Sequence, residues 1–213
     1  RLNFSHVNPA TGPIVVEGAE PGDVLRVHIR AIRYEKTGAR MTATGAGGLP
    51  DREKGDTRIC TIADGHFTFM GVDLPLNPMI GVIGVAPAGE SVPCGTPGDH
   101  GGNMDTIGIR EGAILRLPVF VKGAYLGLGD LHAAMGDGEV SVTGLEVFGE
   151  VDLDLSLEKG ASLPCPLLHD GDEVSFLASA ETVDGAIHAS TGYMPDFLLA
   201  KTSLNADEAL MLM

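Results

Sequence analysis

Acidic residues, histidines and glycines concentrate in three short segments of the chain. The segments are residues 98–105 (GDHGGNMD), 129–132 (GDLH) and 135–139 (MGDGE). In extended backbone, residues two positions apart point to the same face. Three pairs can therefore project together: Asp130 with His132, Asn103 with Asp105, and Asp137 with Glu139. Each pair offers nitrogen or oxygen ligands that suit zinc or another divalent cation.

The glycines and lone polar residues in these segments also have a purely structural interpretation. Glycine permits positive φ and close approach of a ligand to the backbone. Asp-Gly is equally the favoured pair of a hairpin turn, and Asp137-Gly138 taken alone favours such a turn. A lone His100 or His132 is more often a hydrogen-bonded loop residue than a ligand. Cys94, six residues before His100, allows a Cys–His nucleophile pair, but no third activating group is visible and a structural thiol is favoured.

The elements that must position these segments are predicted to be mainly short strands. Strands are expected within residues 14–34 (with a turn at 20–23), 59–69 (a hairpin turning at 63–65), 79–86 (buried on both faces), 113–121, 124–129, 139–147, 151–157 and 174–178. Residues 38–55 predict a mobile loop and residues 169–173 a solvated turn. Short helices are expected at 183–189 and from an N-cap at Ser203 to Leu210.

The predicted fold class is mainly β, sandwich-like or barrel-like, with a small α+β portion near the C-terminus. We expect a single domain over residues 1–213, with a β-rich part at 1–180 and the α+β part at 181–213. The abrupt start at Arg1 and the apolar end at Met213 predict that residues are missing at both ends. The apolar end also predicts burial against another segment or subunit, and we expect a homo-oligomer, most simply a dimer.

The composition of the chain argues against some kinds of binding partner and favours one cellular location. The 213 residues carry a formal net charge of −15 at pH 7, which argues against nucleic acid and anionic membranes as partners. No apolar run approaches the roughly 18 residues that cross a bilayer. Three cysteines with no short spacing favour reduced thiols and a cytoplasmic location; they are Cys60, Cys94 and Cys165.

Longer runs of sequence resemble one known family. Residues 8–23 (NPATGPIVVEGAEPGD), 77–87 (NPMIGVIGVAP), 101–105 (GGNMD) and 129–139 (GDLHAAMGDGE) are similar, in this order, to signatures of the acetamidase/formamidase family. The resemblance implies a β-rich fold and hydrolysis of small linear amides, such as formamide and acetamide, to carboxylate and ammonia. It also implies a divalent metal near the polar segments, with zinc the first expectation and calcium an alternative.

Within that resemblance, roles are assigned as hypotheses. Glu139 is the expected general base and proton shuttle. Asp137 is the second catalytic candidate, which would orient a metal ligand without contacting the metal itself. The predicted metal-proximal residues are His100, Asp105, Asp130 and His132. The predicted substrate-binding residues are Gly101, Gly102 and Asn103.

Two other function classes stay open at this point. A cupin-like metal oxygenase also uses a β-rich scaffold with histidine and carboxylate ligands, usually two histidines and one carboxylate. A non-catalytic β-rich binding module would need no metal and would present exposed aromatic residues. Aromatic residues make up only 5% of the chain and tryptophan is absent, which weakens the binding module.

Overall fold

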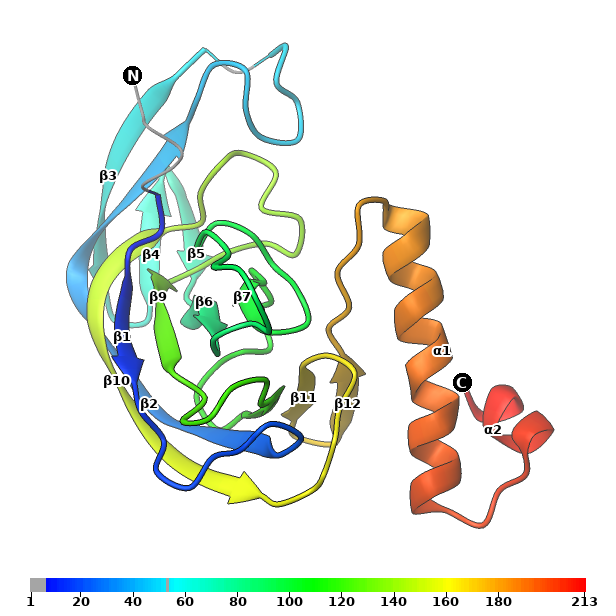
Figure 1. Ribbon diagram of the computed structural model, residues 1–213. Helices are drawn as coiled ribbons and strands as arrows, with labels where there is room; N and C mark the ends of the chain where they lie inside the picture. The colour runs from blue at the N-terminus through cyan, green and yellow to red at the C-terminus, as the bar shows by residue number, and fades with distance from the viewer. Residues whose placement is uncertain (1–6, 53) are drawn as a thin grey trace.

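The computed structural model describes residues 7–52 and 54–213. Within these residues the chain forms one 12-stranded antiparallel sheet followed by two helices, which confirms the mainly-β prediction (Figure 1). The strands are β1 (Ala10–Ile14), β2 (Val24–Thr42), β3 (Asp56–Ala63), β4 (His66–Phe69), β5 (Val72–Pro75), β6 (Met79–Gly84), β7 (Gly101–Asn103), β8 (Ile114–Pro118), β9 (Leu126–His132), β10 (Glu146–Glu158), β11 (Leu167–Asp170) and β12 (Glu173–Phe176). The helices are α1 (Val183–Lys201) and α2 (Ala206–Leu212).

Two long strands, β2 and β10, form the frame of the sheet. They pair antiparallel from Val24↔Glu158 to Ala39↔Glu146 and bend together around one side of the molecule (Figure 1). The apolar residues of β2 alternate as expected for a strand with one buried face, because Val27 and Ile29 are fully buried. The frame therefore presents one apolar face to the inner strands.

The inner strands lie inside this bend. Beyond β10 the strand order continues β9-β6-β7, and Figure 1 shows β6 and β7 within the curve of the long strands. Residues Met79 to Ile83 of β6 are all buried, as predicted for this apolar run, and Ile80 and Ile83 belong to the main hydrophobic core. The predicted hairpin is also confirmed, since Ala63 pairs with His66 across its turn.

Some predicted boundaries are wrong, and close backbone packing is the main reason. Part of the predicted 38–55 loop is strand, because β2 continues to Thr42 and pairs with β3; Glu53 lies outside the described residues. Gly38 serves packing here, since a Cβ would approach the Leu145 side chain to 2.8 Å. In place of the two strands predicted at 139–147 and 151–157, the structure has one strand, β10. It begins only at Glu146, near the end of the first predicted range. Gly149 marks a register shift where a Cβ would collide with the Arg33 carbonyl, and the strand continues through it.

Further corrections concern the edges of the fold. The predicted turn at 169–173 overlaps β11, which pairs with β8 and β12. The predicted helix at 183–189 extends to Lys201 and includes Pro195, and the N-cap of α2 is Asn205 rather than Ser203. Segment 101–103, predicted as loop, forms β7 against β6. For β7 and β11, pairing with a distant segment extends what local sequence indicates.

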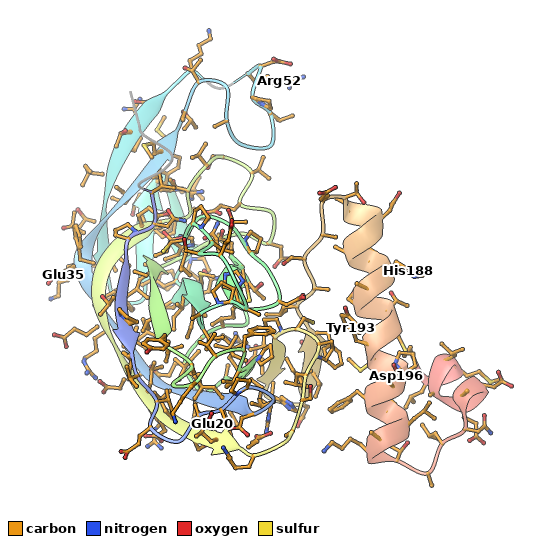
Figure 2. The ribbon with its side chains drawn as sticks, viewed as in Figure 1. Glu20, Glu35, Arg52, His188, Tyr193 and Asp196 are labelled. Atoms are coloured by element: carbon orange, nitrogen blue, oxygen red, sulfur yellow. The ribbon has the colours of Figure 1, made fainter. Side chains whose placement is uncertain are left out.

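The helices stand to one side of the sheet (Figure 1). Figure 2 shows Tyr193 on the side of α1 nearer the sheet and His188 on the other side. Tyr193 contacts Phe176 of β12 with ring centroids 5.8 Å apart, and a cavity of about 720 Å³ separates α1 from β11 and β12. None of the described helices is long and apolar enough to span a membrane.

Candidate metal centre and active site

Five polar side chains converge where β9 meets β10. Asp130 and His132 belong to the end of β9, and Glu146, the first residue of β10, is the register partner of His132. Asp105 follows β7, and Glu139 lies in the loop between β9 and β10. The cluster thus combines segments up to 41 positions apart, brought together by the pairing of β6, β7, β9 and β10.

His132 is the centre of this cluster. Its side chain is 1% exposed, and its Nε2 lies 3.0 Å from Glu146 Oε1, 3.6 Å from Asp130 Oδ1 and 3.8 Å from Glu139 Oε1. None of these contacts has both the distance and the alignment of a hydrogen bond, so Nε2 has no hydrogen-bond partner among the described residues. The other ring nitrogen, Nδ1, lies 3.2 Å from Met135 Sδ.

Two glycines make room for the cluster. A Cβ at Gly81 of β6 would lie 2.7 Å from Asp105 Oδ1 and 2.8 Å from both Asp130 Oδ2 and the Asp130 carbonyl. The two carboxylates therefore converge directly over the bare Cα of Gly81. A Cβ at Gly144 would lie 2.8 Å from His132 Nδ1, so Gly144 gives the imidazole ring its space.

The electrostatics of the cluster show an excess of negative charge. Burial raises the pKa of Asp105, and the neighbouring charge of Asp130 raises it further. Burial and the charge of Asp105 raise the pKa of Glu139 to about 7, and burial also raises the pKa of Glu146. Burial alone would lower the pKa of His132, but the adjacent carboxylates of Asp130 and Glu146 outweigh it and raise that pKa to about 10. Such a site favours an added positive charge.

The backbone of the cluster is held in an uncommon conformation. Asp105, Asp130 and Glu139 have φ values of 40°, 55° and 37°, in the left-handed region that non-glycine residues rarely adopt. Each such residue costs on the order of 1–3 kcal/mol, and such strain clusters at ligand-binding and catalytic sites. The surrounding pairing must therefore hold these three carboxylates against their local preference.

An amide side chain orders one edge of the cluster. Asn8, ahead of β1, also has a positive φ of 56°, and its Nδ2 donates to Asp130 Oδ2 at 3.0 Å and to Asn103 Oδ1 at 3.1 Å. Because the carboxylate of Asp130 receives this bond, its orientation is fixed relative to β7. Asn8 therefore links the N-terminal segment to the cluster.

The residues present fit a divalent cation. Two overlapping sets have ligand atoms within 4.8 Å of one another: Asp105, His132 and Glu139, and Asp130, His132 and Glu146. Asp105 Oδ1 and His132 Nε2 are both buried without a hydrogen-bond partner among the described residues, as uncoordinated ligand atoms would be. One imidazole with carboxylates suits zinc, and the oxygen-rich remainder also suits calcium. Each set holds one histidine, unlike the two-histidine site that the oxygenase alternative usually uses.

The structure brings together only some of the residues singled out by sequence. Asp105, Asp130, His132 and Glu139 share the cluster, whereas His100 is in neither ligand set. The imidazole of His100 is half-buried, and burial lowers its pKa. Asp137 is exposed and outside both sets, so its catalytic role stays a prediction. Gly101 and Gly102 are buried in β7, with Asn103 one hydrogen bond from Asn8.

Sequence reasoning missed one residue of the cluster, Glu146, and one that binds to its edge, Asn8. Glu146 stands inside a predicted strand with no glycine or histidine beside it, and only its register with His132 reveals it. Asn8 opens one of the family-like runs, which was the only signal that could have identified it. The cysteines carry no such signal: Cys60, Cys94 and Cys165 are free, and Cys94 is exposed.

Comparison with known proteins relates this chain to one family. Residues 90–173, which include all five residues of the cluster, match the Acetamidase/Formamidase family. A predicted acetamidase/formamidase from Thermoanaerobacter tengcongensis has 45% identity and a TM-score of 0.95, covering 100% of this chain and 71% of its own. An acetamidase from Bacillus halodurans has 46% identity and a TM-score of 0.95, covering 99% and 72%.

More distant relatives are considerably longer than this chain. A formamidase from Methylophilus methylotrophus is 25% identical over 222 residues, which cover 74% of this chain and 53% of that protein. The chain thus spans little more than half the length of that relative. The two structures that are 45% and 46% identical nevertheless match this chain over nearly all its residues and over more than two thirds of their own. The chain therefore belongs to the acetamidase/formamidase family.

Proposed function

We propose that this protein hydrolyses the C–N bond of small linear amides, such as formamide and acetamide, to a carboxylate and ammonia. The observation that carries the proposal is the buried cluster around His132, in which two ligand atoms lack hydrogen-bond partners among the described residues. Family membership supports the reaction class, because relatives bear the names formamidase and acetamidase. A cluster of this kind suits amide hydrolysis, which needs an activated water and a polarised carbonyl.

A divalent metal, zinc in the first instance, is part of the proposal. Asp130, His132 and Glu146, or Asp105, His132 and Glu139, would hold it. Bound zinc supplies a water whose pKa falls to about 7 and polarises a carbonyl oxygen. Calcium is the alternative that the carboxylate-rich surroundings allow.

Glu139 is the residue best placed to move protons. Its side chain is 19% exposed and lines an adjoining cavity of about 660 Å³, whereas His132 is almost fully buried. Glu139 would take a proton from the attacking water and deliver it to the departing nitrogen, since one positioned carboxylate can serve both steps. The cavity gives a small amide a route to this carboxylate.

The remaining residues position those that react. Asn8 donates to Asp130 and thereby fixes which oxygen of Asp130 faces the cluster. Gly81 leaves the space into which Asp105 and Asp130 project. Asn103, Gly101 and Gly102 remain the proposed substrate-binding residues, because β7 borders the same cluster.

The test is ammonia release from formamide and acetamide after chelation and after addition of zinc or calcium, with metal content measured in parallel. We expect chelation to abolish release and one metal to restore it. Glu139→Gln should lower turnover by about 10²- to 10⁴-fold, the usual contribution of a positioned acid–base group. Asp137→Asn, measured beside it, separates the two candidates for general base.

Glu173→Gln is the matched control, because Glu173 is an exposed carboxyl on β12, away from the cluster. It should match the unsubstituted protein in both turnover and metal content. The proposal would be contradicted if neither amide released ammonia with any of the metals. It would also be contradicted if Glu139→Gln kept full turnover with metal still bound. Loss of metal in Glu139→Gln would instead identify Glu139 as a ligand.

A further inference from the structure

The cavity beside Glu139 has two walls of different origin. One wall comes from the end of β2 and the loop that follows it, and the other from the loop between β9 and β10. The first wall contributes Arg40, Thr42, Leu49, Arg52 and Lys54. The second contributes Met135, Gly136, Asp137, Gly138, Glu139, Val140, Ser141 and Thr143.

The basic and the acidic side chains that line the cavity lie on different walls. All three basic side chains, Arg40, Arg52 and Lys54, belong to the β2 wall, and both acidic ones, Asp137 and Glu139, belong to the other. Figure 2 shows Arg52 on the loop between β2 and β3. The chain has only 14 basic residues and a net charge of −15, so three cations on one cavity wall stand out against the rest of the surface.

These cations form no ion pair with any acidic group that the structure describes. None of Arg40, Arg52 and Lys54 pairs in this way within residues 7–52 and 54–213. Arg30 and Arg33, which lie earlier on β2, do form ion pairs. Arg40 is held over the ring of Phe69, with its guanidinium carbon 5.5 Å from the ring centroid. This cation–π contact uses the face of the guanidinium and leaves its N–H donors available to a ligand.

Hydrogen bonds join the two walls at two points. Gly48 N donates to the Val140 carbonyl at 2.7 Å, and Met41 N donates to Thr143 Oγ1 at 2.8 Å. These bonds tie the walls together at two points while the cavity of about 660 Å³ stays between them. A ligand that spans the walls therefore meets opposite charges at its two ends, with Leu49 and Val140 offering apolar surface.

We propose that the wall formed by Arg40, Arg52 and Lys54 binds a carboxylate, either that of a substrate whose amide end lies at Glu139 or that of a product that has left Glu139. This rests on the proposed amide hydrolysis and deepens it. Two sources of the carboxylate share this chemistry: a remote carboxylate on the substrate, or the carboxylate released from a simple amide. Basic groups recognise carboxylates by charge and by directed N–H donors.

The experiment compares amides that differ only in this group. Succinamate carries an amide and a carboxylate, and succinamide is its neutral counterpart. The metal-loaded protein is assayed with both for kcat/KM, and acetate and succinamate are titrated calorimetrically as a readout that needs no turnover. The variants are Arg52→Gln, Lys54→Gln and the double substitution, all at exposed positions, with exposed Lys36→Gln of β2 as control.

If the substrate supplies the carboxylate, succinamate should exceed succinamide in kcat/KM, and the double variant should lose about three- to tenfold of that preference. This range corresponds to one or two screened charge contacts at a cavity rim. The preference should also shrink as salt rises, since charge interactions are screened beyond about 10 Å at 0.1 M. If the product supplies it, acetate affinity should fall by a similar factor while the ratio of the two amides stays level.

The proposal is overturned if neither acetate nor succinamate binding responds to the double substitution more than to Lys36→Gln. A preference for succinamide in all variants excludes a carboxylate on the substrate, and the proposal is then overturned unless the double substitution weakens acetate binding. Failure of the amidase proposal is separate: no amide would then release ammonia, while calorimetry would still report whether the basic wall binds carboxylates.

Discussion

The sheet around His132 and the C-terminal helices are built in opposite ways. His132 is 1% exposed and surrounded by carboxylates from β9, β10 and two loops. Helix α1 has no buried residue, and Val183, Ile187 and Leu199 are among the large apolar side chains it exposes. The first region buries polar groups within long-range pairing, and the second leaves apolar groups on its surface.

This difference indicates which interactions position each region. Pairing between β6, β7, β9 and β10 holds Asp105, Asp130 and Glu139 at positive φ, so the site depends on contacts far apart in sequence. The helices depend on local signals, such as the caps Thr182 and Asn205. Small changes in the sheet should therefore reach the site, and similar changes in the helices should stay local.

The largest expected effect comes from adding one methyl group beside the cluster, at Gly81. Gly81→Ala would force a Cβ against Asp105 Oδ1 and the Asp130 carbonyl, at 2.7 and 2.8 Å. We expect it to destabilise the fold by about 1–3 kcal/mol, as overpacking does. Amide turnover should fall by about 100-fold, since small misplacement of reacting groups costs this much. Denaturant unfolding and metal content measure the structural part.

The matched change in the helices is Gly192→Ala. Nothing lies within 4 Å of a Cβ at Gly192, which is inside α1. This substitution should stabilise α1 by up to about 1 kcal/mol, because alanine has the higher helix propensity. The same substitution thus has opposite signs in the two regions. A Gly81→Ala protein with unchanged stability and metal affinity would remove the distinction.

A smaller effect should follow from Glu146→Gln. Glu146 Oε1 lies 3.0 Å from His132 Nε2, and the substitution keeps the shape of the side chain while removing its charge. We expect metal affinity to fall by about 10- to 100-fold, as for groups that ligate or orient ligands. Competition with a chelator measures it. Glu150→Gln is the control, because Glu150 is on the same strand with its side chain 81% exposed. Equal affinities in both variants would exclude Glu146 from the site.

Sequence predicted β6 and the β3–β4 hairpin better than the long strands of the frame. The apolar run at β6 and the hairpin of β3 and β4 follow from composition and turn chemistry, and both are confirmed. The continuity of β10 does not follow, because Gly149 resembles a strand break until its contact with the Arg33 carbonyl is known. The length of α1 was also missed, because the predicted helix ends at Ala189 whereas α1 continues through Gly192 and Pro195, two residues of low helix propensity, to Lys201.

The candidate site was predictable where its residues are neighbours in sequence. Asp130 and His132 are two positions apart on one strand, and the structure places both in the cluster. His100 has a similar glycine-rich setting but is in neither set, since spacing does not fix which way a loop side chain points. Glu146 required the register of β10 with β9, which local sequence does not contain.

The last and smallest effect compares two side chains that accept backbone N–H groups. Asp23 is 5% exposed and accepts from the backbone of Glu20 and Gly160 and from Lys159. Asn205 accepts from Glu208 N in a capping box at the start of α2. We expect Asp23→Asn to lower the global melting temperature. Asn205→Ala should cost about 1 kcal/mol and only within α2.

The pH dependence separates the two. The hydrogen bond from Lys159, the largest cause, lowers the pKa of Asp23. A carboxyl with a lowered pKa stabilises the fold above its unfolded pKa of about 3.9, and that stability is lost as pH falls through the folded value. The melting difference between the unsubstituted protein and Asp23→Asn should therefore be full at pH 7 and shrink below about pH 4. Asn205→Ala should show no such trend, and hydrogen exchange should place its effect in α2. A global melting shift in Asn205→Ala as large as that of Asp23→Asn would mean that the helices and the sheet unfold as one unit.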